Sequence, residues 1–259
     1  MGKAAEGAGS PQPHDHGPWD YMILDSERWS GLTEKCETIK AYFEGWQEDL
    51  ARVKMLMADS KYCLEAILVL SCYIGALGSL RYPGEKEDSK AYKRVVHEYS
   101  GRKDFYEQVD LLFFLQWPRS QFRSVKGYLE LKNHEEISRV IRDAYGDEVQ
   151  IKNGTRYISQ QNFLTCVELN PFQSFDRDNL REHLPRFLLC EMLYRYLRCR
   201  AVHDVRFPFV TKVHQVGCGG TCYEDNHAIT RAVLLETTEN ILTNMRLECL
   251  EKAKWPWEL

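Results

Sequence analysis

Arg198 and His203 are the residues of this chain whose types and spacing best suit phosphate chemistry. They lie in the heptapeptide RCRAVHD (residues 198–204), at the end of an apolar-periodic stretch. A guanidinium is permanently charged and can hold phosphate oxygens through two hydrogen bonds. An imidazole takes up or releases a proton near neutral pH. Cleaving a phosphodiester without metal needs a base, an acid and a cation for the developing charge, and this pair supplies such groups.

The spacing of the two residues restricts how they can cooperate. Five residues turn an ideal α-helix through about 500°, which leaves the two side chains roughly 140° apart. They can serve one phosphate if the helix ends near Arg200 and the chain turns, or if a second subunit supplies the missing partner. In the alternative, Arg198 pairs with a nearby acid and His203 caps the helix end.

A helical core that ends in R-x4-H resembles the HEPN family (higher eukaryotes and prokaryotes nucleotide-binding), whose ribonuclease members carry R-x4–6-H. Residues 194–199 (YRYLRC) and 201–204 (AVHD) look like the motif helix of that family, and residues 63–82 are similar to the core helix that precedes it. The resemblance is specific over the motif and architectural over residues 34–252. It implies a homodimer whose paired motifs form one composite cleft that cleaves RNA without metal.

Carried over to this chain, the resemblance implies that Arg198 holds the phosphate and that His203 acts on the 2′-hydroxyl or the leaving group. Arg200 is an extra cation with two alternative roles: it contacts the RNA backbone, or it is simply solvated. Active members often place Asn, Asp or His directly after the arginine, where this chain has Cys199. Members controlled by adenylylation carry a tyrosine two residues after the histidine, where Val205 stands. Two functions stay open: a metal-independent endoribonuclease, by analogy in a defence or toxin system, and a non-catalytic HEPN-like module that binds a nucleotide, RNA or a protein.

A second group of residues has the chemistry of a metal site. His214, Cys218, Cys222 and His227 offer the two imidazoles and two thiols that suit tetrahedral zinc, and glycines between them can wrap an ion. Their spacing differs from that of a standard zinc finger, so the alternative is a loop with incidental ligands. We expect no catalytic cofactor, and a structural role for zinc if the metal binds.

Composition and charge are those of an ordinary globular chain. The 259 residues are 44% hydrophobic and 28% charged, with 34 basic and 38 acidic residues and a net charge of −4. This length suits one large domain. The charge excludes a basic field over the whole protein, so RNA would have to meet a local patch.

Cysteine usage and the N-terminus predict a cytoplasmic protein without a membrane partner. Nine cysteines is an odd number, and several lie in apolar runs, which is typical of reduced thiols. Residues 1–19 contain no apolar stretch of the kind found in secretion signals. The longest apolar run, residues 66–80, looks too short and too mixed to span a bilayer.

The elements that position these residues are predicted to be mostly helical. We expect a disordered tail over residues 1–18 and a single HEPN-like helical domain over residues 19–259. Apolar residues recur at helical spacing over residues 34–59, 60–82, 89–99, 104–117, 135–145, 178–203 and 228–254. The second of these is apolar nearly all round and should be the central helix, with Gly75 and Gly78 leaving room for a neighbour.

One stretch departs from the helical pattern. Val149, Ile151, Tyr157 and Ile158 flank residues 152–155 (KNGT), whose Asn-Gly pair is a strong turn signal. We therefore predict a β-hairpin insertion near residues 147–170. Residues 205–216 are expected to be extended and residues 217–226 to form a loop.

Overall fold

The computed structural model describes residues 18–119, 131–170, 172, 175–214 and 221–259 of the chain. Within these ranges the fold is mostly helical, with two small antiparallel sheets of two strands each. The prediction of a mostly α fold is confirmed. The predicted tail over residues 1–18 lies outside the described residues except for Pro18, which begins the first helix.

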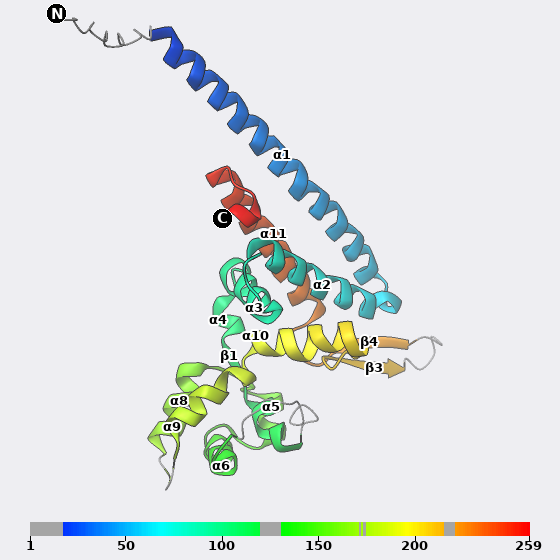
Figure 1. Cartoon of the computed structure of the whole chain (residues 1–259). Helices are drawn as coiled ribbons and strands as arrows, with labels where there is room; N and C mark the ends of the chain where they lie inside the picture. The colour runs from blue at the N-terminus through cyan, green and yellow to red at the C-terminus, as the bar shows by residue number, and fades with distance from the viewer. Residues whose placement is uncertain (1–17, 120–130, 171, 173–174, 215–220) are drawn as a thin grey trace, which may run out of the picture.

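Four helices form the bundle that carries much of the core: α1 (Pro18–Ala58), α2 (Cys63–Arg81), α3 (Asp88–Tyr99) and α11 (Arg231–Lys252). α2 contacts the other three helices, and its side chains Leu70, Ile74 and Leu77 are fully buried. It is therefore the central helix that its apolar pattern predicts. Figure 1 shows α1 as a long helix whose N-terminal part extends beyond the rest of the fold.

α2 is also the one helix in the described ranges that is long and apolar enough to cross a membrane, judged by length and composition alone. The expectation that this run is too short for a bilayer is therefore wrong. Half of the apolar window is buried inside the fold. The core helix of a bundle meets the same two criteria, because burial among other helices also requires an apolar surface on every side.

Gly78 lets α3 pass close to α2. A Cβ atom at this position would lie 2.9 Å from the carbonyl oxygen of Ala91 and 3.1 Å from its carbonyl carbon. Both atoms belong to the α3 backbone, which cannot give way as a flexible side chain would. The close helix approach predicted from the two glycines of α2 is confirmed at Gly78.

A second group of short elements lies at the end of the bundle away from the start of α1 (Figure 1). It contains α4 (Lys103–Tyr106), β1 (Gln108–Asp110), α5 (Leu111–Gln116), the 3-10 turn η2 (Trp117–Arg119), α6 (His134–Tyr145), α7 (Glu148–Asn153), β2 (Tyr157–Ser159), α8 (Gln160–Leu169), α9 (Arg177–His183) and the 3-10 turn η4 (Leu184–Phe187).

The predicted hairpin near residues 147–170 is wrong in its first half. Val149 and Ile151 lie in α7, because Asp147 and Gln150 form a capping box that starts a helix. The Asn-Gly pair therefore ends α7 and does not turn a hairpin. Tyr157–Ser159 is a strand as expected, but it pairs with β1, with Val109 opposite Ile158.

One continuous helix carries the RCRAVHD motif. It runs over residues 189–204, beginning as α10 (Leu189–Glu191) and continuing as the π-helical segments Met192–Arg198 and Arg200–Asp204. We call it the motif helix. The single helix predicted over residues 178–203 is divided into α9 and the motif helix, because Pro185 lies in η4 and Leu188 is extended. Figure 1 shows it crossing the molecule between the bundle and the second group of elements.

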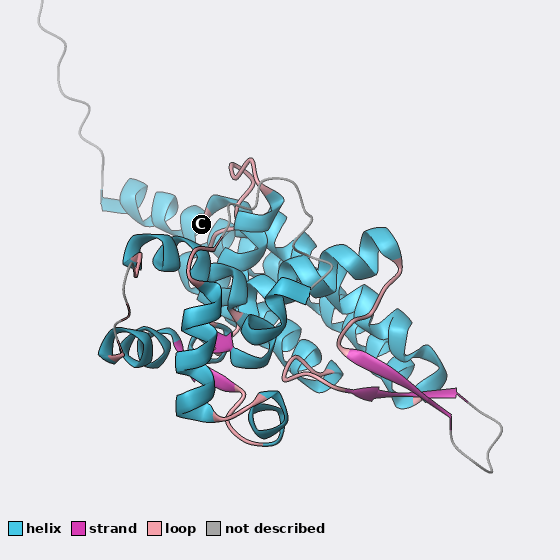
Figure 2. Cartoon of the chain, turned by 90° about the horizontal axis from the view of Figure 1, so that it is seen from below, coloured by secondary structure: helices cyan, strands magenta, loops and turns pink. Residues whose placement is uncertain are grey.

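An antiparallel hairpin follows the motif helix. β3 (Val210–His214) pairs with β4 (Thr221–Asp225), and Val213 lies opposite Cys222. The extended stretch predicted over residues 205–216 is confirmed for Val210–His214, while residues 215–220 lie outside the described residues. The loop expected over residues 217–226 is wrong for Thr221–Asp225. Figure 2 shows the hairpin projecting from the helical body.

Candidate functional site

The motif helix continues to Asp204, close to the predicted end at residue 203, and does not break near Arg200. Its winding is what changes the geometry of the motif. A π-helix closes hydrogen bonds between residues five apart and has roughly 4.4 residues per turn, so five residues turn through roughly 410°. Arg198 and His203 are therefore about one turn apart and near one face of the helix. The helix break that α-helical winding would have required is not needed.

Arg198 is anchored between the motif helix and the bundle. Its Nη2 atom lies 2.7 Å from Oδ2 of Asp88, at the start of α3, and its guanidinium lies 5.4 Å from the ring centroid of Tyr194. A Cβ atom on Gly75 of α2 would come within 3.8 Å of Nη2, so the guanidinium packs against that helix. Only 18% of the side chain is exposed. Burial opposes the charge, but the Asp88 carboxylate raises the pKa of Arg198 and keeps it protonated.

His203 and Arg200 lie at the exposed end of the motif helix. His203 is exposed, and Arg200 forms an ion pair with Asp204, whose pKa it lowers. Val205 then ends the helix with a φ of 52°. A β-branched residue is strained in this left-handed region. The helix therefore stops directly after the motif and leaves His203 at its last turn.

The three predicted site residues thus share one helix but differ in their surroundings. Arg198 is mostly covered by α2 and α3, Arg200 is partly covered, and His203 is exposed. A single chain supplies one Arg198 and one His203 at the end of the motif helix. The composite cleft that the family resemblance implies would need a second copy of the chain.

No protein-family model, curated protein or solved structure matches this chain. The HEPN resemblance therefore rests on the motif residues and on the helical architecture.

The four candidate zinc ligands have different surroundings. Cys218 lies outside the described residues, while the thiol of Cys222 donates to the carbonyl oxygen of Val213 across the hairpin at 3.6 Å. The ring of His227 is buried. Its Nε2 lies 3.1 Å from Oδ2 of Asp110, and its Nδ1 accepts a hydrogen bond from the backbone N–H of Ile229 at 3.1 Å. Both nitrogens are occupied, so His227 has none left for a metal ion in this conformation. The described part of the chain contains no group of three or more His, Cys, Asp or Glu side chains placed to hold one.

A buried charge cluster that the sequence analysis missed surrounds Asp110. This side chain is fully buried and caps α5 by accepting from the N–H of Phe113 at 2.9 Å. Nε and Nη2 of Arg156 donate to the same carboxylate at 3.1 and 2.8 Å, and His227 adds the third partner. Phe209 stacks on the imidazole of His227, with ring centroids 3.9 Å apart. We call Asp110, Arg156 and His227 the charge cluster; it ties together β1, the residue before β2 and the residues after β4.

The shifts in pKa indicate that His227 is neutral and lies beside an ion pair formed by Asp110 and Arg156. Burial alone would raise the pKa of Asp110, but hydrogen bonds from His227 and Arg156 lower it. Burial lowers the pKa of His227, and the attraction of Asp110 does not fully offset this. One sequence signal could have revealed the cluster. Asp110 is an isolated acid in the apolar run VDLLFFL, and a buried acid of this kind needs partners.

Acid should destabilise this protein through His227. Its folded pKa lies below the usual 6.5, so the unfolded chain binds a proton that the folded chain does not bind. The free energy of unfolding should therefore fall as the pH drops below about 6.5. The lowered pKa of Asp110 extends the loss below about pH 4, where the unfolded carboxylate takes up a proton. Urea denaturation at pH 7.5, 6.5 and 5.5 measures the first effect.

The control for this pH dependence is His227→Gln, which keeps a donor toward Asp110 but cannot titrate. His97, whose pKa burial also lowers, contributes to the same pH window in both proteins. The difference between the two pH profiles therefore isolates His227. Identical profiles for the wild type and His227→Gln would show that His227 does not cause the loss of stability below about pH 6.5.

Proposed function

We propose that this chain is a metal-independent endoribonuclease of the HEPN type that acts as a homodimer. The supporting observation is that His203 is exposed about one π-helical turn after Arg198, a cation already held in place by Asp88. Arg198 binds the scissile phosphate, His203 transfers protons, and Arg200 contacts the RNA backbone. RNA lies across two copies of the helix end, so that each copy contributes one histidine.

The reaction proceeds by internal transfer within the RNA. His203 of one subunit accepts the proton of the ribose 2′-hydroxyl, and the 2′-oxygen forms a bond to phosphorus. The bond between phosphorus and the 5′-oxygen breaks, and His203 of the partner subunit, protonated at the start, gives its proton to that oxygen. The products are a 2′,3′-cyclic phosphate and a 5′-hydroxyl. Negative charge that develops on the phosphate oxygens is stabilised by Arg198.

A second function is favoured by the burial of Arg198. With 18% of its side chain exposed and Asp88 at 2.7 Å, this arginine has the surroundings of a structural residue. The chain would then be a non-catalytic HEPN-like module that binds RNA, a nucleotide or a protein. Incubating the purified protein with mixed RNA in EDTA separates the two functions. Cleavage supports the ribonuclease, and intact RNA that remains bound supports the module.

Asp88→Asn should strengthen RNA binding severalfold if Arg198 contacts phosphate. The Asp88 carboxylate competes with a phosphate for the Arg198 guanidinium and also repels that phosphate. An approaching phosphate would meet this carboxylate, because 44% of the Asp88 side chain is exposed. Filter binding of RNA at 50 and 200 mM salt measures the change, which should shrink at the higher salt as charges are screened. Asp104→Asn, at an acid of α4 outside the motif, is the matched control. Unchanged binding by Asp88→Asn would show that Arg198 is structural.

We also propose a cytoplasmic location. The eight cysteines in the described ranges are free thiols, and some of them, such as Cys63 and Cys190, are buried. Thiols of this kind persist in a reducing compartment. A role in defence or toxin systems is proposed by analogy with the family that the motif resembles.

A further inference from the structure

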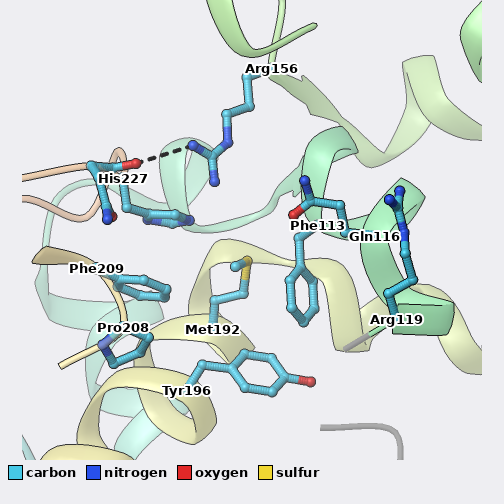
Figure 3. A pocket seen from close by; sticks show the side chains of 10 residues that line it. Phe113, Gln116, Arg119, Arg156, Met192, Tyr196, Pro208, Phe209 and His227 are labelled. Atoms are coloured by element: carbon cyan, nitrogen blue, oxygen red, sulfur yellow. Dashed lines mark hydrogen bonds between the residues drawn. The ribbon is translucent and has the colours of Figure 1, made fainter. Parts of the chain in front are cut away.

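A cavity of about 540 Å³ lies beside the charge cluster, between α5, the motif helix and the residues that flank the β3–β4 hairpin. This volume falls in the range of small-molecule sites. Figure 3 shows Phe209 and Pro208 on one side, Phe113 and Gln116 on the other, and Arg156 reaching in above Met192 and Tyr196. The described lining residues are Phe113, Gln116, Arg119, Arg156, Met192, Tyr196, Pro208, Phe209, Asn226 and His227.

The walls of the cavity suit a flat apolar ring. Phe209 is fixed by its stacking on the buried His227, with the two rings 9° from parallel. Phe113 packs against Tyr196 with ring centroids 4.8 Å apart, and Met192 lies between the two walls in Figure 3. Aromatic faces and a thioether favour contact with another aromatic ring.

The charged side chains that line the cavity are basic, although each of them pairs with an acid outside the lining. Arg119 and Arg156 are its charged lining residues, and no acid is among the lining residues that the structure describes. Asp110 is fully buried behind Arg156. Glu148 pairs with Arg119 and accepts from Gln116 at 3.0 Å, but it does not line this cavity.

Arg156 keeps donors for a ligand after its internal bonds are made. A guanidinium has five N–H groups. Nε and Nη2 each donate toward Asp110, and Nη1 donates to the carbonyl oxygen of Asn226 at 3.3 Å. This leaves one N–H on each terminal nitrogen. Two neighbouring N–H groups on a guanidinium match the two oxygens of a carboxylate or phosphate. The hold of Asp110 on the other edge fixes the orientation of this fork.

We propose that this cavity binds a small planar molecule that carries one anionic group, a carboxylate or a phosphate. The ring lies between Phe209 and Phe113, and the anion is bound by Arg156, with Arg119 at the mouth. Arg119 has 68% of its side chain exposed and can turn from Glu148 to the ligand. This site is separate from the RCRAVHD motif and does not depend on the ribonuclease function.

Isothermal titration calorimetry of the full chain with 1-naphthoate tests the proposal. Two probes separate the contributions: 1-naphthalenemethanol has the ring without charge, and inorganic phosphate has the charge without a ring. We expect 1-naphthoate to bind at least about tenfold more tightly than either. Replacing it with 1-naphthyl phosphate shows whether the anion is preferred as a carboxylate or as a phosphate. Equal affinity for 1-naphthoate and 1-naphthalenemethanol would overturn the proposal. So would the absence of binding by both 1-naphthoate and 1-naphthyl phosphate.

Variants at exposed positions locate the binding without disturbing the core. Gln116→Trp places a large side chain at the edge of the cavity and should abolish the heat of 1-naphthoate binding, whereas the exposed Gln161→Trp on α8 should leave it unchanged. Arg119→Gln should weaken binding several-fold, and Arg52→Gln, at an equally exposed arginine of α1 that also pairs with an acid, should have no effect. Binding that survives Gln116→Trp unchanged would place the ligand elsewhere and contradict the assignment.

Discussion

Replacing His203 with alanine should lower the single-turnover rate constant of RNA cleavage at least about a hundredfold. A composite site loses both its base and its acid in this variant, since each subunit contributes the same histidine. The fold should be unaffected, because His203 is exposed on the last turn of the motif helix. Cleavage of labelled RNA under single-turnover conditions, with circular dichroism as the test of folding, measures the effect.

Val205→Ala is the matched control for this variant. Val205 is the exposed residue that ends the same helix, and its side chain has no group that transfers protons or binds phosphate. We expect it to cleave RNA at the wild-type rate. If His203→Ala and Val205→Ala cleave equally well, the histidine has no part in the reaction, and the binding module becomes the better account of the motif.

Asp110→Asn should be the most destabilising single substitution among the residues discussed above, lowering the free energy of unfolding by about 3–5 kcal/mol. Asp110 is fully buried, and its carboxylate accepts from Arg156, His227 and the backbone of Phe113. An asparagine would leave the guanidinium of Arg156 without a counterion. The amide nitrogen of the asparagine would also face the N–H donors of Arg156, His227 or Phe113, with which it cannot form a hydrogen bond. Urea denaturation at pH 7.5 measures the loss.

Asp176→Asn is the matched control for this prediction. Asp176 also caps a helix by accepting from a backbone N–H three residues later at 2.9 Å, but it lies on the surface. Asparagine is nearly as good an N-cap as aspartate, so its substitution should cost far less. Equal losses from both variants would show that Asp110 acts as a cap alone. A larger loss at Asp110 assigns the difference to the buried ion pair.

The charge cluster also gives the cavity beside it a defined shape. Arg156 is held on one edge by Asp110 and at one terminal nitrogen by the Asn226 carbonyl, while His227 supports the ring of Phe209. The two sets of hydrogen bonds made by Arg156 join residues that are 46 and 70 positions apart in the chain. A rigid, preformed site of this kind loses little entropy when a ligand binds.

The helical part of the fold could be predicted because its signals are local. The apolar periodicity of α2 and the glycine at position 78 indicated a central helix with a close neighbour, and both are present. The hairpin prediction failed because the Asn-Gly signal at residues 153–154 competed with a capping box at Asp147 and Gln150. β2 found its partner in β1, far away in sequence, and no local pattern marks such a pairing.

In the candidate site, too, the local motif could be recognised in the sequence, but the contacts with residues far away in the chain could not. The sequence predicted Arg198, Arg200 and His203 as site residues, but not the π-helical winding that brings Arg198 and His203 to about one face of the helix. Nor did it show that Asp88 of α3 would hold Arg198. The charge cluster was missed because its three members come from segments that only the folded chain brings together.

The chemistry at the ends of cleaved RNA shows directly whether His203 catalyses internal transfer within the RNA. Purified wild-type protein should be incubated with mixed RNA in EDTA, beside His203→Ala, and the new termini identified by their reactivity toward a 5′-kinase and a cyclic-phosphate-specific ligase. We expect 2′,3′-cyclic phosphates and 5′-hydroxyls from the wild type and no new ends from His203→Ala. New ends of any other kind, or undiminished cleavage by His203→Ala, would contradict it.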